Sequence, residues 1–238
     1  MIVAHRGGAA LWVENSLVAF RNALAAGYPA IEFDVVGTRD EALVVIHDTT
    51  LDRTTNGTGR VADADLDAVR RLRLTGADEP VPTLDELLHL MTDSAALAIV
   101  EIKFPADGPA HERLCARLLG GLDRHGLIDR TTISAFDWRS LATLRHLSDQ
   151  VNLTGVIDRK RIDAGGGLAP AIERLRAVGA GDFGLQWTMI DRETVAQVRA
   201  AGMKLGAWTP NGPDELRRMA DLGVDWIITD RPDLAVRQ

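Results

Sequence analysis

The sequence is poor in cysteine and aromatic residues, and it has no excess of positive charge. Its single cysteine, Cys115, excludes an intramolecular disulfide framework and is typical of a reducing compartment. The formal net charge of -7 provides no basic surface for nucleic acid or anionic lipid, so any phosphate must be recognised locally. No apolar run reaches membrane-spanning length, and no signal-peptide pattern precedes the first strand. We therefore expect a cytoplasmic protein with no nucleic-acid partner and no stable membrane anchor.

Short apolar runs rich in β-formers alternate with helical patterns along the whole chain. Eight strand and helix units in 238 residues favour a (β/α)8 TIM barrel, which is an α/β fold, over a doubly wound open sheet. No Pro/Gly/Ser-rich linker interrupts them, so we expect residues 1–238 to form one domain. The strands are expected at 2–5, 30–36, 97–103, 131–135, 153–157, 182–186, 204–209 and 226–229.

One segment breaks this alternation after the second strand. Only residues 37–42 separate Val36 from the next apolar run, which is too short for a crossover helix and predicts a β-hairpin. A turn centred near residues 40–41 would make paired residue numbers sum to about 81 and set His47 opposite Asp34. We expect residues 49–81 to form a small insertion over the barrel mouth.

Three carboxylates fall near the carboxyl ends of neighbouring strands. Glu32 and Asp34 point to one side of their strand because side chains alternate, and Glu101 lies on the next barrel strand. Like charges so close repel each other unless a cation or a catalytic use keeps them ionised. An all-oxygen set suits Mg²⁺ or Ca²⁺ better than Zn²⁺, so the pattern predicts one divalent cation here.

Cationic and imidazole side chains accompany the carboxylates. Arg6 and Lys103 provide the positive charge expected where a phosphoryl group is held against a metal. His5 ends the first strand and His47 ends the hairpin, and imidazole titrates near neutrality. The two histidines are therefore candidates for a general base and a general acid.

Nine short motifs together resemble the glycerophosphodiester phosphodiesterase family, and most closely its short cytoplasmic bacterial members. They follow one another in order over nearly the whole chain: His5-Arg6-Gly7, Glu14-Asn15-Ser16, Glu32-Phe33-Asp34-Val35, Val45-Ile46-His47-Asp48, Leu51-Asp52-Arg53-Thr54-Thr55-Asn56-Gly57, Pro82-Thr83-Leu84, Glu101-Ile102-Lys103, Trp208-Thr209-x-Asn211 and Ile228-Thr229-Asp230. The sequence departs from the family pattern at Val13, where proline is common, and at Ser16, where threonine is common.

The resemblance implies a barrel with a divalent ion on Glu32, Asp34 and Glu101. It also implies catalysis by His5 and His47, with Arg6 and Lys103 on the phosphate. The implied reaction converts a small glycerophosphodiester to sn-glycerol 3-phosphate and an alcohol. The hydroxyl next to the phosphoester is expected to attack first and give a five-membered cyclic phosphate.

Two other functions stay open at this point. One is a lysophospholipase D-like activity on single-chain lipids, and the other is a non-catalytic barrel that binds phosphorylated metabolites. The absence of an obvious amphipathic anchor favours water-soluble diesters. The sequence does not identify the leaving alcohol, the metal used, the histidine that acts as base, or whether the chain forms a homo-oligomer.

Three further residues have two interpretations each. Asn15 is a candidate for substrate binding or for the cap of the first helix, and Trp208 for a wall against the glycerol moiety or for barrel packing. Asp230 is interpreted as a surface turn residue in preference to one that orients the site.

Overall fold

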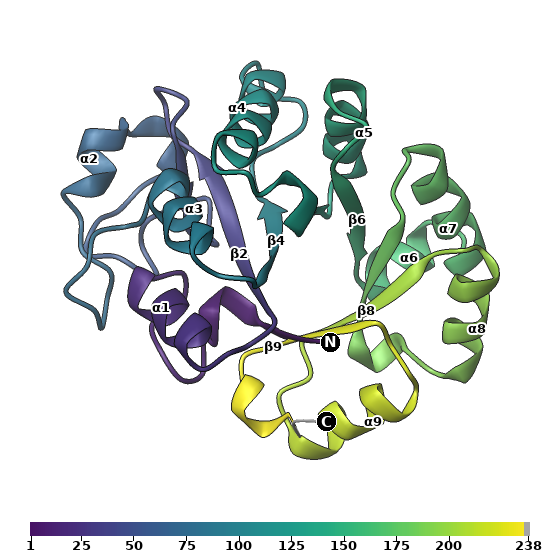
Figure 1. The fold of residues 1–238 in the computed structure, drawn as a ribbon. Helices are drawn as coiled ribbons and strands as arrows, with labels where there is room; N and C mark the ends of the chain where they lie inside the picture. The colour runs from purple at the N-terminus through teal and green to yellow at the C-terminus, as the bar shows by residue number, and fades with distance from the viewer. Residues whose placement is uncertain (236–238) are drawn as a thin grey trace.

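The computed structural model describes residues 1–235 and places eight parallel strands in a closed barrel with helices around it (Figure 1). Closure comes from β1, which pairs with both β2 and β9. The TIM-barrel prediction is confirmed, and each expected strand agrees with the observed one to within one residue at either end. The parallel strands are β1 (Ile2–Ala4), β2 (Ala30–Gly37), β4 (Leu97–Ile102), β5 (Thr131–Ala135), β6 (Asn152–Ile157), β7 (Asp182–Gln186), β8 (Lys204–Trp208) and β9 (Trp226–Thr229).

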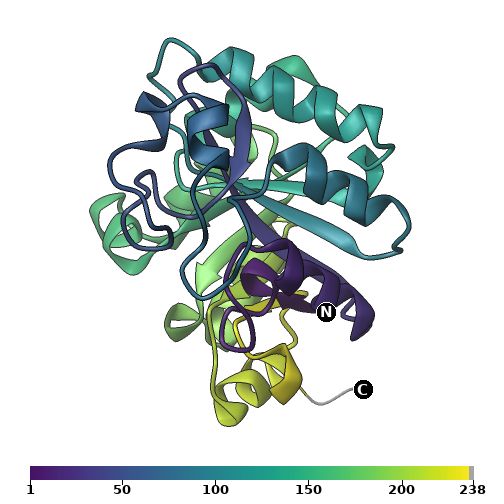
Figure 2. The same ribbon diagram turned by 90° about the vertical axis from the view of Figure 1, so that its left-hand side faces the viewer.

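Helices cover the outside of the barrel (Figures 1 and 2). They are α1 (Leu17–Ala25), α2 (Leu66–Arg70), α3 (Leu84–Thr92), α4 (His111–Arg124), α5 (Trp138–Leu147), α6 (Arg159–Ala164), α7 (Leu168–Ala177), α8 (Arg192–Ala200) and α9 (Pro213–Asp221). Single 3₁₀ turns lie at η1 (His5–Gly7), η2 (Val61–Asp63), η3 (Ile128–Arg130), η4 (Trp187–Met189) and η5 (Pro232–Leu234). No helix within residues 1–235 is long and apolar enough to cross a membrane.

Local signals explain where the helices begin and end. The Thr83 hydroxyl accepts a hydrogen bond from the Glu86 backbone, and the Glu86 carboxylate accepts one from the Thr83 backbone, which together form a capping box at the start of α3. The chain leaves α1 through Gly27 with φ 75°, a left-handed conformation that glycine adopts at little cost.

Apolar side chains fill the barrel interior below the carboxylates. Val3, Ala30, Ile99, Trp226 and Ile228 form a buried cluster of their own. Ala30 shares a strand face with Glu32 and Asp34, because side chains two residues apart point the same way. This cluster is therefore the floor of the polar end of the barrel.

The register of the hairpin differs from the prediction by one residue. The short strand β3 (Leu43–Val45) pairs with β2 so that Val35 faces Val45, and paired numbers sum to 80 rather than 81. The Ile46 backbone N–H therefore donates to the Asp34 carbonyl at 3.1 Å, and the expected pairing of His47 with Asp34 is wrong. The reason is a three-residue turn that includes Glu41 at φ 63° and moves the closing pair by one position.

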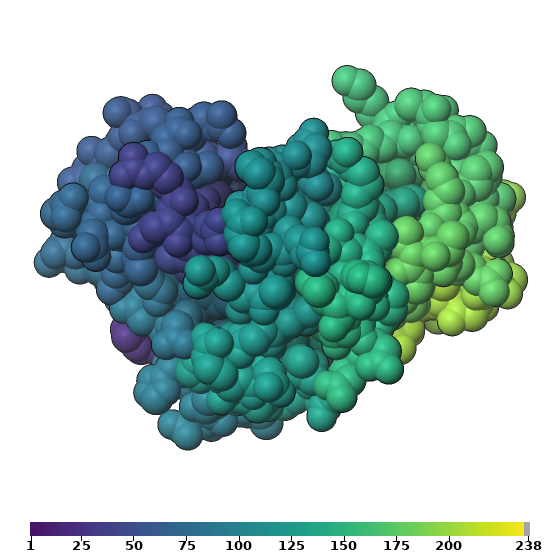
Figure 3. Space-filling model, turned by 90° about the horizontal axis from the view of Figure 1, so that it is seen from above, coloured from purple at the N-terminus to yellow at the C-terminus, as the bar shows by residue number. Residues whose placement is uncertain are grey.

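Residues 49–81 leave the barrel after the hairpin and return before α3. They contain α2 and η2, and they pack on the hairpin through a small apolar cluster of Val36, Val44, Ile46, Leu51, Val61, Val69, Leu74 and Val81. In Figure 3 this blue segment lies on the opposite side of the viewed face from the green residues that follow β6. The division into one barrel domain with an insertion stays our interpretation.

Candidate active site

Three carboxylates meet at the end of two adjacent barrel strands. β2 carries Glu32 and Asp34, and β4 carries Glu101, which is paired in register with Asp34. One oxygen from each of the three lies within 4.8 Å of the others, and within residues 1–235 this is the only such group of three or more His, Cys, Asp or Glu side chains. Glu32 is 1% exposed and Asp34 is 0% exposed. These residues could hold a metal ion.

The charge state of the cluster fits a site built for a cation. Burial, followed by repulsion from Asp34, raises the pKa of Glu32 to about 8, and burial also raises the pKa of Glu101. Burial acts to raise the pKa of Asp34 too, but Lys103 and Arg6 outweigh it and hold that pKa below its usual value. One oxygen of Asp34, Oδ1, is buried and accepts no well-oriented hydrogen bond, although the Lys103 ammonium lies 3.2 Å from it. A divalent cation would relieve both the repulsion and this unsatisfied oxygen.

Two basic side chains border the carboxylates. Lys103 places its Nζ 2.5 Å from Glu101 Oε1 and 3.2 Å from Asp34 Oδ1. Arg6 places its Nε 3.3 Å from Asp34 Oδ2, and its backbone N–H donates to Glu32 Oε2 at 3.0 Å. The sequence-predicted cations are thus brought to the predicted carboxylates, where they provide positive charge for an anionic ligand.

His5 is held by a residue from the far end of the chain. Its Nδ1 lies 2.5 Å from Asp230 Oδ1, and its Nε2 lies 3.9 Å from Glu32 Oε2. Asn211 in turn donates to Asp230 Oδ2 at 2.6 Å and accepts the Asp230 backbone N–H at 2.9 Å. Asp230 lies in the bend after β9, but it also orients His5, so the preference for a turn role over an orienting one is wrong. Burial acts to lower the pKa of His5, but Glu32 and Asp230 outweigh it and the pKa is raised.

His47 has a matching partner next to it in the sequence. Its Nδ1 lies 2.7 Å from Asp48 Oδ1. Burial lowers the pKa of His47 despite the nearby Asp34. Each histidine thus has a carboxylate on Nδ1, an arrangement that fixes the ring and leaves Nε2 for chemistry.

One cavity of about 160 Å³ is lined by both histidines, both basic side chains, Glu32 and Glu101. Its lining residues are His5, Arg6, Glu32, His47, Ile99, Glu101, Lys103, Ser134, Phe136, Val156, Trp208, Thr209, Trp226 and Ile228. Ser134 and Phe136 were not predicted, and they reach the cavity because β5 lies beside β4 in the barrel. Their only sequence signal was their place at the end of the next strand.

The two weaker candidates differ in their positions. Asn15 does not line the cavity, and its buried side chain instead donates to Asp34 Oδ2 at 2.9 Å. The helix-cap alternative for Asn15 is wrong, because the Ser16 hydroxyl accepts the Ala19 N–H and caps α1. Trp208 does line the cavity, and its buried indole N–H has no acceptor within the described chain.

Comparison with known proteins agrees with this geometry. A sequence model of the glycerophosphoryl diester phosphodiesterase family matches residues 5–234. The glycerophosphodiester phosphodiesterase of Caldanaerobacter subterraneus subsp. tengcongensis is 31% identical over 99% of this chain and 96% of its own length. That of Bacillus altitudinis is also 31% identical, over 99% of this chain and 96% of its own length.

A solved structure gives the same result for the fold. A protein from Agrobacterium tumefaciens strain C58, provisionally named a glycerophosphoryl diester phosphodiesterase, superimposes with a TM-score of 0.92 at 33% identity. The match covers 99% of this chain and 95% of that one. Fold, sequence match and site agree, and the chain belongs to the glycerophosphoryl diester phosphodiesterase family.

Proposed function

We propose that this phosphodiesterase hydrolyses small glycerophosphodiesters to sn-glycerol 3-phosphate and an alcohol, with one divalent cation and two histidines. The observation that carries the proposal is the cluster of three carboxylates, two of which line one cavity together with two basic side chains and two carboxylate-bound imidazoles. Membership of the family supports the substrate class.

Glu32, Asp34 and Glu101 would hold Mg²⁺ or Ca²⁺, because hard cations prefer carboxylate oxygens. When bound, such an ion neutralises phosphoryl charge and acidifies a hydroxyl that it contacts. Arg6 and Lys103 would bind the remaining phosphoryl oxygens, since both border the carboxylates on the cavity wall. Trp208 would pack against the glycerol moiety from another part of that wall.

His5 would take the proton of the attacking hydroxyl at Nε2, and His47 would give a proton to the departing alcohol oxygen. The roles would reverse when water opens the intermediate. In the ion-free protein the raised pKa of His5 and the lowered pKa of His47 favour the opposite order. A cation held by Glu32, whose Oε2 is 3.9 Å from His5 Nε2, would disfavour a proton on that nitrogen, so we keep His5 as the base.

The attacking group would be the glycerol hydroxyl next to the phosphoester. A hydroxyl tethered to the same molecule has the proximity advantage of an intramolecular reaction. Attack would form the new P–O bond of a five-membered cyclic phosphate as the bond to the leaving alcohol breaks. Water would then open the ring to give sn-glycerol 3-phosphate.

The test compares glycerophosphocholine with its analogue lacking the 2-hydroxyl, with binding of both confirmed independently. We expect release of glycerol 3-phosphate and a transient cyclic phosphate by ³¹P NMR from the first, and no turnover of the second. Cleavage of both at comparable rates would replace the cyclic route with direct attack by water. A parallel assay with lysophosphatidylcholine separates the proposed substrates from single-chain lipids, and faster turnover of the lipid would contradict the substrate class.

A further inference from the structure

We propose that Arg53 is a positioning residue for the reaction, because it joins the loop after β1 to the loop after β3 and holds the carboxylate that orients His47. The proposal rests on the role given to His47 under the proposed function. Arg53 lies in the segment 49–81 rather than in a barrel strand. Its contacts connect that segment to both sides of the barrel mouth.

On the His47 side, Arg53 binds Asp48, the residue that contacts the imidazole. Its Nε donates to Asp48 Oδ2 at 2.6 Å, and its Nη2 donates to Asp48 Oδ1 at 3.1 Å. The same Oδ1 lies 2.7 Å from His47 Nδ1. A bidentate contact of this kind fixes the plane of a carboxylate, whereas a single hydrogen bond leaves the carboxylate free to rotate.

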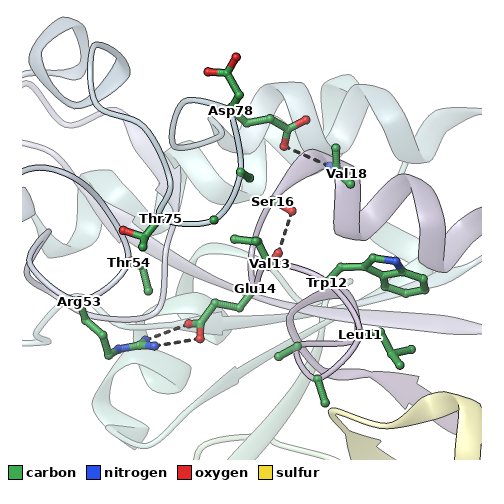
Figure 4. A pocket seen from close by; sticks show the side chains of 15 residues that line it. Leu11, Trp12, Val13, Glu14, Ser16, Val18, Arg53, Thr54, Thr75 and Asp78 are labelled. Atoms are coloured by element: carbon green, nitrogen blue, oxygen red, sulfur yellow. Dashed lines mark hydrogen bonds and ion pairs between the residues drawn. The ribbon is translucent and has the colours of Figure 1, made fainter.

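On the side of the loop after β1, Arg53 binds Glu14. Nη1 donates to Glu14 Oε2 and Nη2 to Glu14 Oε1, both at 2.8 Å (Figure 4). Glu14 Oε1 also accepts from Arg6 Nη1 at 3.0 Å, and Arg6 Nε is 3.3 Å from Asp34. A continuous polar chain therefore runs from the imidazole of His47 to a proposed metal ligand.

Arg53 does not line the cavity that contains the proposed catalytic groups. It lines a separate groove of about 960 Å³ between residues 9–14 and residues 75–79, and Figure 4 shows its guanidinium facing Glu14 there. Any influence on the reaction must therefore pass through Asp48 and Glu14. Because Arg53 does not line the reaction cavity, we assign it a positioning role and not a role in contact with the substrate.

The shape of the guanidinium matters as well as its charge. Its side chain is 47% exposed, and an exposed ion pair alone contributes little to stability. Holding two carboxylates at once requires a planar, branched donor, which lysine cannot provide. The Arg53 contact is the largest cause that lowers the pKa of Asp48 to about 2, which reflects how closely the guanidinium holds this carboxylate.

The experiment compares R53Q and R53K with a matched control, R39Q. Arg39 makes a similar two-pronged contact with Asp65, at 2.9 Å through Nε, and is more exposed than Arg53. Removing the hydrogen-bond partner of a metal-ligating side chain typically costs about 10–100-fold in activity. Arg53 reaches His47 only through Asp48, so we expect kcat to fall by about 10-fold in R53Q with KM unchanged, a smaller fall in R53K, and no change in R39Q.

A spectroscopic readout follows the ring itself. In ¹⁵N-histidine-labelled protein, with signals identified by comparison with H47A, we expect His47 to carry its proton on Nδ1 in the parent and R39Q. In R53Q we expect a mixture of tautomers, measured below the unfolding temperature of that variant. Wild-type kcat in R53Q, a change in KM alone, or an unchanged His47 tautomer would overturn the proposal.

The same panel separates this inference from the proposed function. Near wild-type turnover in H47A would show that His47 has no catalytic role, which would contradict the proposed function itself. Loss of turnover in H47A together with full turnover in R53Q would overturn only the role of Arg53.

Discussion

Binding of a divalent cation to the carboxylate cluster should release a proton near neutral pH. In the ion-free protein, burial and the nearby Asp34 raise the pKa of Glu32 to about 8. At pH 7, about nine in ten molecules would then carry a proton on Glu32. A carboxylate must be deprotonated to ligate a metal, so each cation bound should displace about one proton.

This linkage sets the size and the sign of a pH effect on affinity. The fraction of protein with Glu32 ionised rises from about 1% at pH 6 to about half at pH 8, so the affinity for Mg²⁺ or Ca²⁺ should rise about 50-fold over this range and level off above it. Stability should move the opposite way in the ion-free protein. Between the ordinary pKa of glutamate and about 8 the folded state binds more protons than the unfolded state, so the free energy of unfolding falls as pH rises.

Isothermal titration calorimetry in two buffers of different ionisation enthalpy measures both the affinity and the protons released. His5 Nε2 is 3.9 Å from Glu32 and also titrates, so the same titration of His5→Asn isolates the contribution of Glu32. Glu32→Gln should bind weakly and without the pH dependence. Equal affinities at pH 6 and pH 8 with no proton released would show that Glu32 is already ionised before the cation binds.

Three other predictions concern the histidines, the orienting carboxylate and the barrel floor. His5→Ala and His47→Ala should each lose roughly 10²–10⁴-fold in kcat with unchanged circular dichroism, and near wild-type turnover of either would contradict its catalytic role. Asp230→Asn keeps the size but removes the charge on His5 Nδ1, so steady-state assays should show kcat lower by about 10–100-fold; full activity would mean that Asp230 does not position the ring. In Gly206→Ala the new Cβ would lie 2.0 Å from the Trp226 ring, and urea unfolding should show a loss of about 1–3 kcal/mol, whereas an unchanged midpoint would show that the indole moves aside.

The eight barrel strands and the charged residues at their ends could be predicted from the sequence alone. Parallel strands buried on both faces require continuous apolar runs, and these runs are visible without any tertiary information. Period-two alternation then places Glu32 beside Asp34, and strand order places Glu101 next to them. These placements follow from side-chain alternation and from the rule that consecutive barrel strands are neighbours. They therefore stay correct when the predicted ends of a strand are wrong by a residue.

The partners that hold these residues depend on the tertiary structure and could not be predicted from the sequence. The hairpin register depends on the left-handed conformation of Glu41, which a residue other than glycine rarely adopts and which no local pattern indicated. Asp230 reaches His5 across 225 residues because β1 and β9 close the barrel, and Arg53 reaches Glu14 because the segment 49–81 folds back toward the loop after β1. Contacts of this kind depend on where whole elements come to lie, since a hydrogen bond requires atoms to be placed within a few tenths of an ångström, and residue spacing along the chain does not specify that.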